Sequence, residues 1–423
     1  MKFGVFFPQQ LPRPWADGAE AELFRTALDV VELADRVGVS HAWAQEHHFL
    51  EEYSHSTAPE VFLGACSQRT RQIRLGHGVS IMLPPVNHPA RVAERIATLD
   101  LVSGGRADWG TGEMSSHIEL GGFGVNYVEK RAMWAEAVRE VAIMMSAAPY
   151  PGYSGKYFSM PARNLVPKPI QRPHPPLWIA CTNRDTLRLA ARLGAGALTF
   201  AFMSPSEAKF WVEEYYEIFR RECVPIGQAV NPNVATLIGF YCDRDGDALK
   251  QAETDQRFFK HGLAHYYRFG QHVPGHTDIW REFERAPETP MAGLEGVGPP
   301  ESLIARFREY EASGVDQLIL LQQAGRMSAD RVCASLELFG REVIGEFLAR
   351  DIGREKAKAE ALAPFIEKAM GAVTGPRDAD LTAVEAYPTL WDQKAGASAD
   401  ASPTRAIEAP SLWNLHVGGG RRA

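Results

Sequence analysis

Residues 36–43 read RVGVSHAW, and this stretch decides the fold, because it joins the end of a helical pattern to a short apolar strand through a glycine. Gly38 suits the left-handed conformation in which many helices end. Similar junctions recur at 192–199 (RLGAGALT) and, more loosely, at 312–319 (ASGVDQLI). They lie 192 − 36 = 156 and 312 − 192 = 120 residues apart, about four and three units of roughly 40 residues. Repeated units of this size predict a (β/α)8 barrel.

Outward from these junctions, short apolar runs alternate with stretches of helical period. The alternation assigns the chain to the α/β class, as a (β/α)8 TIM barrel with insertions and a C-terminal extension. Residues 147–176 are predicted to be an insertion, and residues 258–300 depart from the repeat and are long enough for a lid, with 258–275 as the candidate segment. The eight predicted strands are 3–7, 39–44, 73–82, 106–110, 177–180, 195–201, 234–242 and 317–321. The clearest predicted helices are 23–37, 88–102, 128–145, one from about 184, and a last one that includes 332–347.

The C-terminal part differs in composition from the barrel. Residues 1–350 are the predicted barrel domain, and residues 351–423 are predicted to be a helix followed by an extended tail. A helix fits the Ala-, Lys- and Glu-rich segment 357–369, whereas 371–423 is rich in Ala, Gly, Pro, Ser and Asp, which favours an extended or partly disordered chain. Large apolar residues leave open a second interpretation, an arm packed on a neighbouring subunit: Tyr387, Leu390, Trp391 and Trp413.

The composition of the 423 residues excludes several classes of protein. Hydrophobic residues make up 45% and charged residues 23%, which is typical of a globular protein with an ample core. Lys and Arg total 45 against 52 Asp and Glu, and this net charge of −7 argues against nucleic acid or an anionic membrane as the main partner. Five scattered cysteines show neither metal-ligand nor disulfide spacing, so we expect a reducing compartment and no metal. No targeting peptide or membrane span is apparent, and we therefore expect the cytoplasm.

The sequence Glu46-His47-His48-Phe49 follows the second predicted strand, at the end where barrel enzymes place their chemistry. If the strand register continues, Glu46 and His48 face one side and His47 the other. The alternative to a chemical role is a structural one, in which the two histidines form hydrogen bonds with carbonyl groups of the loop. A zinc site is disfavoured because adjacent histidines lack metal-ligand spacing.

Two further strand ends are candidates for ligand contact. Small residues in 76–85 let a planar ligand approach the backbone, or simply allow close packing against a helix. Thr182 lies at the start of a predicted helix, where free N–H groups and hydroxyls attract an anion, although Thr182 also suits the role of helix cap. Arg131, which begins another helix, supplies a countercharge. The glycine-rich segment 104–112 matches neither a dinucleotide fingerprint nor a P-loop.

Five pieces of the chain are Met1-Lys2-Phe3-Gly4, 43–49 with Glu-His-His-Phe, Leu83-Pro84 with His88-Pro89, 100–110 with Gly-Arg, and Cys181-Thr182. Together they resemble the luciferase-like flavin-dependent monooxygenases, and the resemblance runs from Met1 to about Leu348. The resemblance implies a barrel that binds FMN, whose reduced form reacts with dioxygen so that a C4a-peroxyflavin oxidises a small organic substrate such as an aldehyde or ketone. It also implies a separate NAD(P)H:flavin reductase as the source of reduced FMN, and we expect a homo-oligomer, in the first place a dimer.

The resemblance implies roles for individual residues. His47 matches the catalytic histidine, which assists proton transfer at the flavin, and the Val79–Ser80 bond matches a non-proline cis peptide beneath the flavin ring. Gly112 stands where the family's light-emitting members have a reactive cysteine, and Glu113 stands where they have a phosphate-binding arginine, so that Glu113 repels a phosphate unless it is turned away. The matching cofactor contacts are Val79, Ser80, Gly112, Ile179, Ala180 and Cys181, with Arg131 and Thr182 at the phosphate. The candidate pocket walls are Phe6, Trp109, Phe200 and Phe202, and the candidate lid carries His261, His265, Tyr266, Tyr267 and Phe269.

Two alternatives stay open. A deazaflavin-dependent oxidoreductase of the same barrel superfamily would transfer hydride and ignore oxygen, but the paired histidines favour FMN. The second alternative is a non-catalytic flavin-binding or partner subunit; His47 and the intact flavin-contacting strand ends argue against it, whereas Glu113 supports it.

Overall fold

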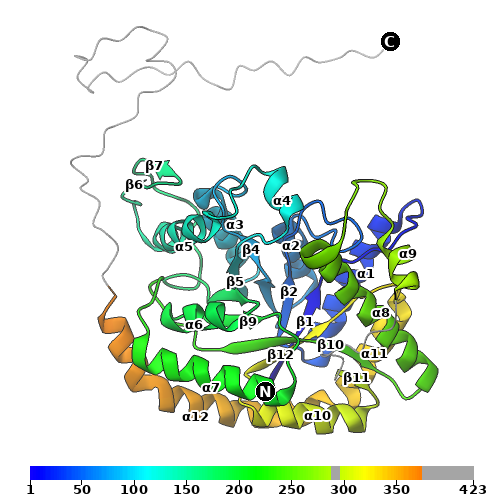
Figure 1. The fold of residues 1–423 in the computed structure, drawn as a ribbon. Helices are drawn as coiled ribbons and strands as arrows, with labels where there is room; N and C mark the ends of the chain where they lie inside the picture. The colour runs from blue at the N-terminus through cyan, green and yellow to red at the C-terminus, as the bar shows by residue number, and fades with distance from the viewer. Residues whose placement is uncertain (287–295, 374–423) are drawn as a thin grey trace, which may run out of the picture. The chain divides into compact units, whose positions relative to one another are not determined.

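The computed structural model describes residues 1–286 and 296–373, and in them the predicted barrel is confirmed (Figure 1). Eight parallel strands pair in a closed ring, in which the last strand bonds both the first and the strand before it. In ring order these strands are β1 (Lys2–Phe7), β2 (His41–Ala44), β3 (Arg74–His77), β5 (Ala107–Gly112), β8 (Leu177–Cys181), β9 (Gly196–Thr199), β10 (Val234–Cys242) and β12 (Gln317–Leu321). Short extra strands are β4 (Ser80–Ile81) on β5, the hairpin β6 (Tyr153–Ser154) and β7 (Ser159–Met160) in the predicted insertion, and β11 (Gly296–Gly298) on β10.

Helices surround the barrel, and the glycine junctions set their ends. Gly38 has φ 91° and closes the first helix through its N–H to Ala34, as the sequence predicts. Gly194 and Gly314, at the two related junctions, also have positive φ (67° and 89°). The surrounding helices are α1 (Ala19–Val37), α2 (Pro59–Arg69), α3 (Pro89–Val102), α4 (His117–Gly122), α5 (Lys130–Ser146), α6 (Arg184–Arg192), α7 (Pro205–Glu222), α8 (Gly246–Ala264), α9 (Ile279–Arg285), α10 (Pro300–Ala312) and α11 (Ala329–Glu342).

Two predicted elements are divided in the structure. The strand predicted over 73–82 is split into β3, which pairs with both β2 and β5, and β4, which pairs with β5 alone, and the register against β5 changes by one residue between them. The helix predicted through 332–347 ends at Glu342, and Val343, with φ −117° and ψ −53°, separates it from α12 (Ile344–Gly371).

Helix α12 continues through the predicted boundary at 350/351, and within the described residues the barrel and this helix belong to one compact unit. Figure 1 shows α12 beside α7, at the end of the molecule where the N-terminus lies. Ion pairs hold α12 to the amino ends of two strands: Lys2 Nζ to Glu355 at 2.8 Å and Lys358 Nζ to Asp316 at 2.8 Å. Gly371, with which the predicted tail begins, is the last residue of α12, and residues 374–423 lie outside the described residues.

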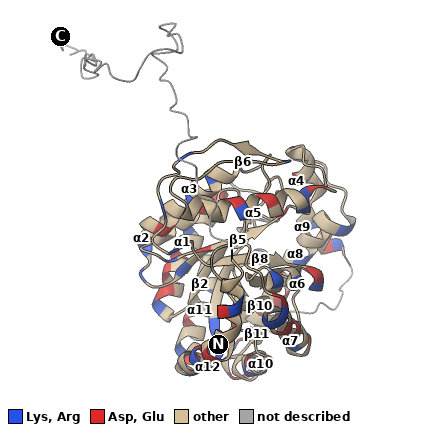
Figure 2. Cartoon of the chain, turned by 90° about the vertical axis from the view of Figure 1, so that its left-hand side faces the viewer, with Lys and Arg blue, Asp and Glu red and all other residues tan. Residues whose placement is uncertain are grey.

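The core has two layers. Aromatic and aliphatic side chains such as Phe6, Trp43 and Ile319 fill the barrel interior, and a larger apolar layer lies between the strands and the helices. Charged residues gather on the outer helices and loops (Figure 2). Among the described residues no helix has the length and apolar character needed to cross a membrane.

Candidate active site at the carboxyl end of the barrel

Unusual backbone conformations indicate that the functional site lies at the carboxyl end of the barrel. Within the described residues, four non-glycine residues have positive φ: Gln9 (52°), Phe49 (63°), Phe202 (51°) and Gln323 (53°). Each follows the carboxyl end of a barrel strand by a few residues. Such conformations are uncommon in residues other than glycine, and they cluster at functional sites.

His47 lies at this end and is paired with a buried carboxylate. Its Nδ1 is 3.0 Å from Oε1 of Glu119 on α4, and the backbone N–H of His48 donates to the same oxygen at 2.9 Å. The Glu119 side chain is 0% exposed and His47 is 20% exposed. Glu119 was not predicted from the sequence; the available signal was a single carboxylate between the apolar residues Ile118 and Leu120.

The adjacent histidine faces the other side, as the strand register predicts. His48 Nε2 is 3.2 Å from Glu46 Oε1, which also accepts from Asn87 Nδ2 at 2.7 Å. The second oxygen of Glu46 accepts from the backbone N–H of Ile81 at 2.7 Å. Glu46 and His48 therefore join the end of β2 to β4 and to the segment before α3, which is a structural role.

Two tyrosines flank His47. The ring of Tyr53 stands edge-on at 5.5 Å and that of Tyr267 at 6.5 Å. Burial, and secondly the charge of Glu119, raises the pKa of both phenols, so both stay neutral near pH 7.

Tyr267 comes from the predicted lid. Residues 258–275 form the end of α8, a π-helical turn η1 (His265–Phe269) and the loop after it. Glu51 accepts a hydrogen bond from Gly275 N at 2.7 Å, and Glu52 accepts one from Ile279 N at 2.5 Å. These two carboxylates hold the segment against the loop that follows β2.

Four of the predicted cofactor contacts lie together at the ends of β4, β5 and β8. Ser80 pairs with Thr111 beside Gly112. A Cβ atom on Gly112 would lie 2.6 Å from Val79 Cγ2 and 3.4 Å from Ala180 Cβ, so only glycine fits there. The prediction of a cis bond at Val79–Ser80 is wrong by one residue, since the cis bond is Gly78–Val79. A cis bond brings neighbouring Cα atoms close, and Gly78 has no Cβ to collide.

Two other predicted contacts have side chains that face away. Ile179 and Cys181 pack in the layer between strands and helices, because alternate residues of β8 point to opposite faces. The Cys181 thiol donates to Ile179 O at 3.3 Å, and burial raises its pKa to about 12. The side chain of Ala180 alone of these three is partly exposed.

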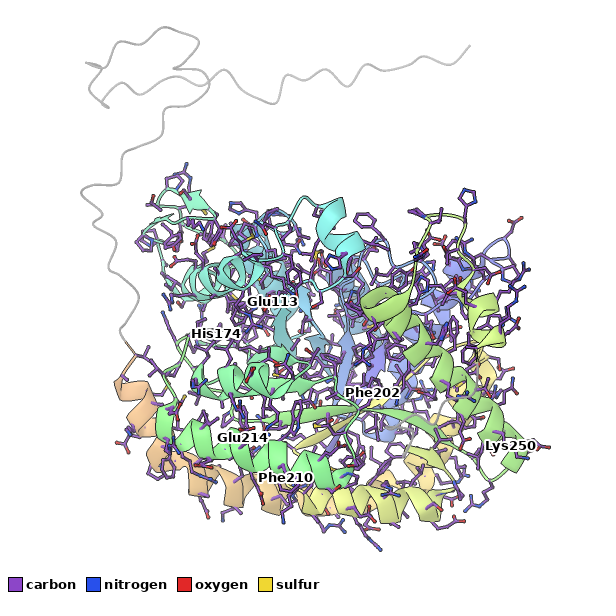
Figure 3. All side chains as sticks on the ribbon, in the orientation of Figure 1. Glu113, His174, Phe202, Phe210, Glu214 and Lys250 are labelled. Carbon is purple, nitrogen blue, oxygen red and sulfur yellow. The ribbon has the colours of Figure 1, made fainter. Side chains whose placement is uncertain are left out.

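The predicted phosphate site contains both signs of charge. Glu113 (Figure 3) forms ion pairs with Arg131 and with Lys130, whose Nζ lies 3.5 Å from it. Lys130 Nζ also donates to Met114 O at 2.7 Å, and burial lowers the pKa of Lys130. Two cations thus surround one carboxylate, and Glu113 is turned toward them.

Thr182 does not cap its helix. The cap of α6 is Asn183, whose side chain accepts from Thr186 N at 3.0 Å. Thr182 is exposed at the turn before this cap.

A cavity of about 570 Å³ lies at the opposite, amino end of the barrel. Its buried polar groups bond one another: Arg74 Nε and Trp178 Nε1 both donate to Asp108, at 2.5 and 2.9 Å, and Gln317 bonds His41. We interpret this end as structural.

The fold and the histidine–carboxylate pair define a barrel enzyme with acid–base groups at the carboxyl end of its strands. The luciferase-like monooxygenase family model matches residues 1–317. The chain therefore belongs to the luciferase-like monooxygenases and is an oxidoreductase of that flavin-dependent family.

Individual relatives agree with this assignment. The oxygenase component of the flavin-dependent trigonelline monooxygenase from Acinetobacter baylyi is 25% identical over 86% of this chain and 100% of that protein. The uncharacterized protein y4wF from Sinorhizobium fredii is 38% identical, but the match spans 42% of this chain and 51% of that one. Among solved structures, the monooxygenase RslO1 from Streptomyces bottropensis has a TM-score of 0.67 at 24% identity, covering 82% of this chain and 100% of that one. An F420-dependent secondary alcohol dehydrogenase has the same fold, with a TM-score of 0.62 at 19% identity, covering 81% and 98%.

Proposed function

We propose that this protein is the oxygenase component of a two-component system, which uses reduced FMN and dioxygen to oxidise a small organic substrate such as an aldehyde or ketone. A separate NAD(P)H:flavin reductase supplies the reduced FMN. The observation that carries the proposal is the His47–Glu119 pair at the same end of the barrel as Gly112, Val79 and Ala180.

The residues at this end fit FMN. Gly112 lets the ends of β4, β5 and β8 approach one another closely, and neither Gly112 nor Ala180 presents a bulky side chain to a flat ring. Lys130 and Arg131 exceed Glu113 by one charge, so the site keeps a net attraction for a phosphate. Val79, Ser80, Gly112 and Ala180 would hold the ring system, and Arg131 with Thr182 the phosphate. Ile179 and Cys181 would contribute through their backbone.

Reduced FMN supplies the two electrons that activate dioxygen. His47 holds or moves a proton beside the reacting atoms, as a histidine can near neutral pH. The segment that carries Tyr267 keeps water from this proton, because Glu51 and Glu52 hold it over His47. The five unpaired cysteines agree with a reducing compartment, so we place the reaction in the cytoplasm, and we propose a homodimer.

The test is an anaerobic titration of the purified protein with reduced FMN, followed by rapid mixing with oxygenated buffer. We expect tight binding, and a delay in the release of hydrogen peroxide relative to free reduced FMN. Adding a flavin reductase and NADH would give oxygen consumption coupled to substrate oxidation. A protein that binds no flavin would contradict the proposal.

A deazaflavin-dependent hydride transfer is the second candidate. The same fold in an F420-dependent secondary alcohol dehydrogenase favours it. Tighter binding of reduced F420 than of reduced FMN, with no reaction toward oxygen, would select this alternative.

A further inference from the structure

We propose that Glu119 is a positioning residue for His47, which holds the ring with its proton on Nδ1 so that Nε2 is the atom that accepts and returns a proton. The inference rests on the proposed role of His47, and it goes further by assigning different roles to the two ring nitrogens.

The hydrogen bonds of Glu119 Oε1 define which ring nitrogen carries the hydrogen. The backbone N–H of His48 can only donate, so Oε1, 2.9 Å away, is an acceptor. His47 Nδ1 lies 3.0 Å from the same oxygen and therefore meets an acceptor. The bond forms only if Nδ1 carries a hydrogen, and the neutral ring then has its lone pair on Nε2.

The rest of the ring's surroundings keep this arrangement in place. The backbone N–H of His47 donates to Ser56 O at 2.9 Å, which fixes the loop that carries the ring. Tyr53 packs edge-on against the ring from the same loop, and Tyr267 packs against it from η1.

Charge supports the same assignment. The groups that face His47 are Tyr53 from its own loop, Tyr267 from η1 and Glu119 from α4; Glu46 and His48 pair with each other on the other side. Both phenols are neutral near pH 7, so Glu119 is the anion among the facing groups. When Nε2 accepts a proton, the imidazolium is balanced by this carboxylate. When Nε2 returns the proton, Glu119 is unchanged and the proton balance is zero.

The structure offers a sharp substitution. Glu119 Oε2 is buried and has no hydrogen-bond partner among the described residues. In Glu119→Gln the amide nitrogen can take the place of Oε2, so the variant keeps the acceptor at Oε1 and loses the charge. Glu119→Leu removes the acceptor as well.

The experiment is ¹⁵N NMR of the ring nitrogens in protein labelled with ¹⁵N-histidine, titrated with pH without flavin. The wild type should show a protonated Nδ1 and an unprotonated Nε2 above the pKa of His47. Glu119→Gln should keep this tautomer and lower the pKa of His47 by about one unit or more. Glu119→Leu should move the proton toward Nε2. Glu46→Gln is the matched control, a buried glutamate on the same strand end that should change the signals of His48 and not those of His47.

A proton on Nε2 in the neutral wild-type ring would overturn the inference, and this measurement needs no variant to fold. An unchanged His47 pKa in folded Glu119→Gln would also overturn it. A second experiment measures the product formed per reduced FMN as a function of pH. In Glu119→Gln this pH profile should shift in the same direction as the pKa of His47. The NMR results can agree with the inference while substitutions of His47 and Glu119 leave the product formed per reduced FMN unchanged. In that case Glu119 still positions His47, but the proposed role of His47 in the reaction is wrong.

Discussion

At the residue scale, His47 and His48 are neighbours in sequence with different tasks. His47→Asn should leave the Kd for reduced FMN within about twofold while the product formed per reduced FMN falls severalfold and hydrogen peroxide rises, because the proton step is lost and cofactor contacts are kept. His48→Asn is the matched control: it should keep coupling and lower the Tm, because Glu46 loses a partner. Unchanged coupling in His47→Asn, measured as product per reduced FMN, would remove His47 from the mechanism.

The phosphate site gives a second prediction at this scale. Arg131→Ala should weaken FMN about tenfold or more and riboflavin little, because only FMN has the phosphate that a charge-assisted hydrogen bond recognises. Glu113→Gln should tighten FMN, since it frees Arg131 and Lys130 from their anion. Isothermal titration with both flavins measures the two effects, and equal losses for FMN and riboflavin in Arg131→Ala would exclude a phosphate contact.

The sequence could place His47 at a strand end, because a strand followed by polar residues is a local pattern. It could not find Glu119, because the bond to His47 joins residues 119 − 47 = 72 positions apart through a short helix of weak pattern. The pairing of Glu113 with Arg131 was missed for the same reason: each residue was judged separately, and their distance depends on how β5 meets α5.

At the element scale, Gly112 shows how closely β4, β5 and β8 meet. Gly112→Ala should lower the free energy of unfolding by about 1–3 kcal/mol, because the new Cβ would lie 2.6 Å from Val79 Cγ2. Gly64→Ala, in the middle of α2 with nothing within 4 Å of its Cβ, should instead raise it by about 0.5–1 kcal/mol. Urea denaturation of both variants tests the pair, and equal effects would contradict the close approach at Gly112.

The elements themselves were largely predictable. All eight barrel strands and the glycine ends of the helices follow from periodicity and from single residues such as Gly38. Divisions inside a continuous apolar pattern could not be predicted. The split between β3 and β4 comes with a one-residue change of register against β5, and the break at Val343 leaves the helical period intact.

At the scale of the whole molecule, buried histidines predict acid sensitivity. Burial lowers the pKa of His41, His77 and His174 (Figure 3) below the ordinary value of 6.5. The unfolded chain then binds more protons than the native one, so stability is complete above about pH 6.5 and is lost as the pH falls toward the native pKa values. We expect the Tm to fall steadily from pH 7 to pH 5 in calorimetry.

His174 provides the variant for this prediction. Its Nδ1 bonds Pro175 O at 2.8 Å and its Nε2 accepts from Gln228 N at 3.2 Å, so a second proton would break the latter bond. His174→Gln should lower the Tm at pH 7 and reduce its slope between pH 7 and pH 5. A Tm that is flat over this range in the wild type would show that these histidines can be protonated without cost.

The barrel can close only when its first strand, β1, pairs with its last strand, β12. Lys2 pairs with Gln317, so the strand made first must wait for one that lies 317 − 2 = 315 residues later. At roughly 5–20 residues per second, a ribosome takes on the order of 15–60 s to make the connecting chain, during which β1 has an unpaired edge. The ion pairs from α12 to Lys2 and Asp316 involve residues that are made later still, so α12 can stabilise the closed ring only after the last strand has emerged.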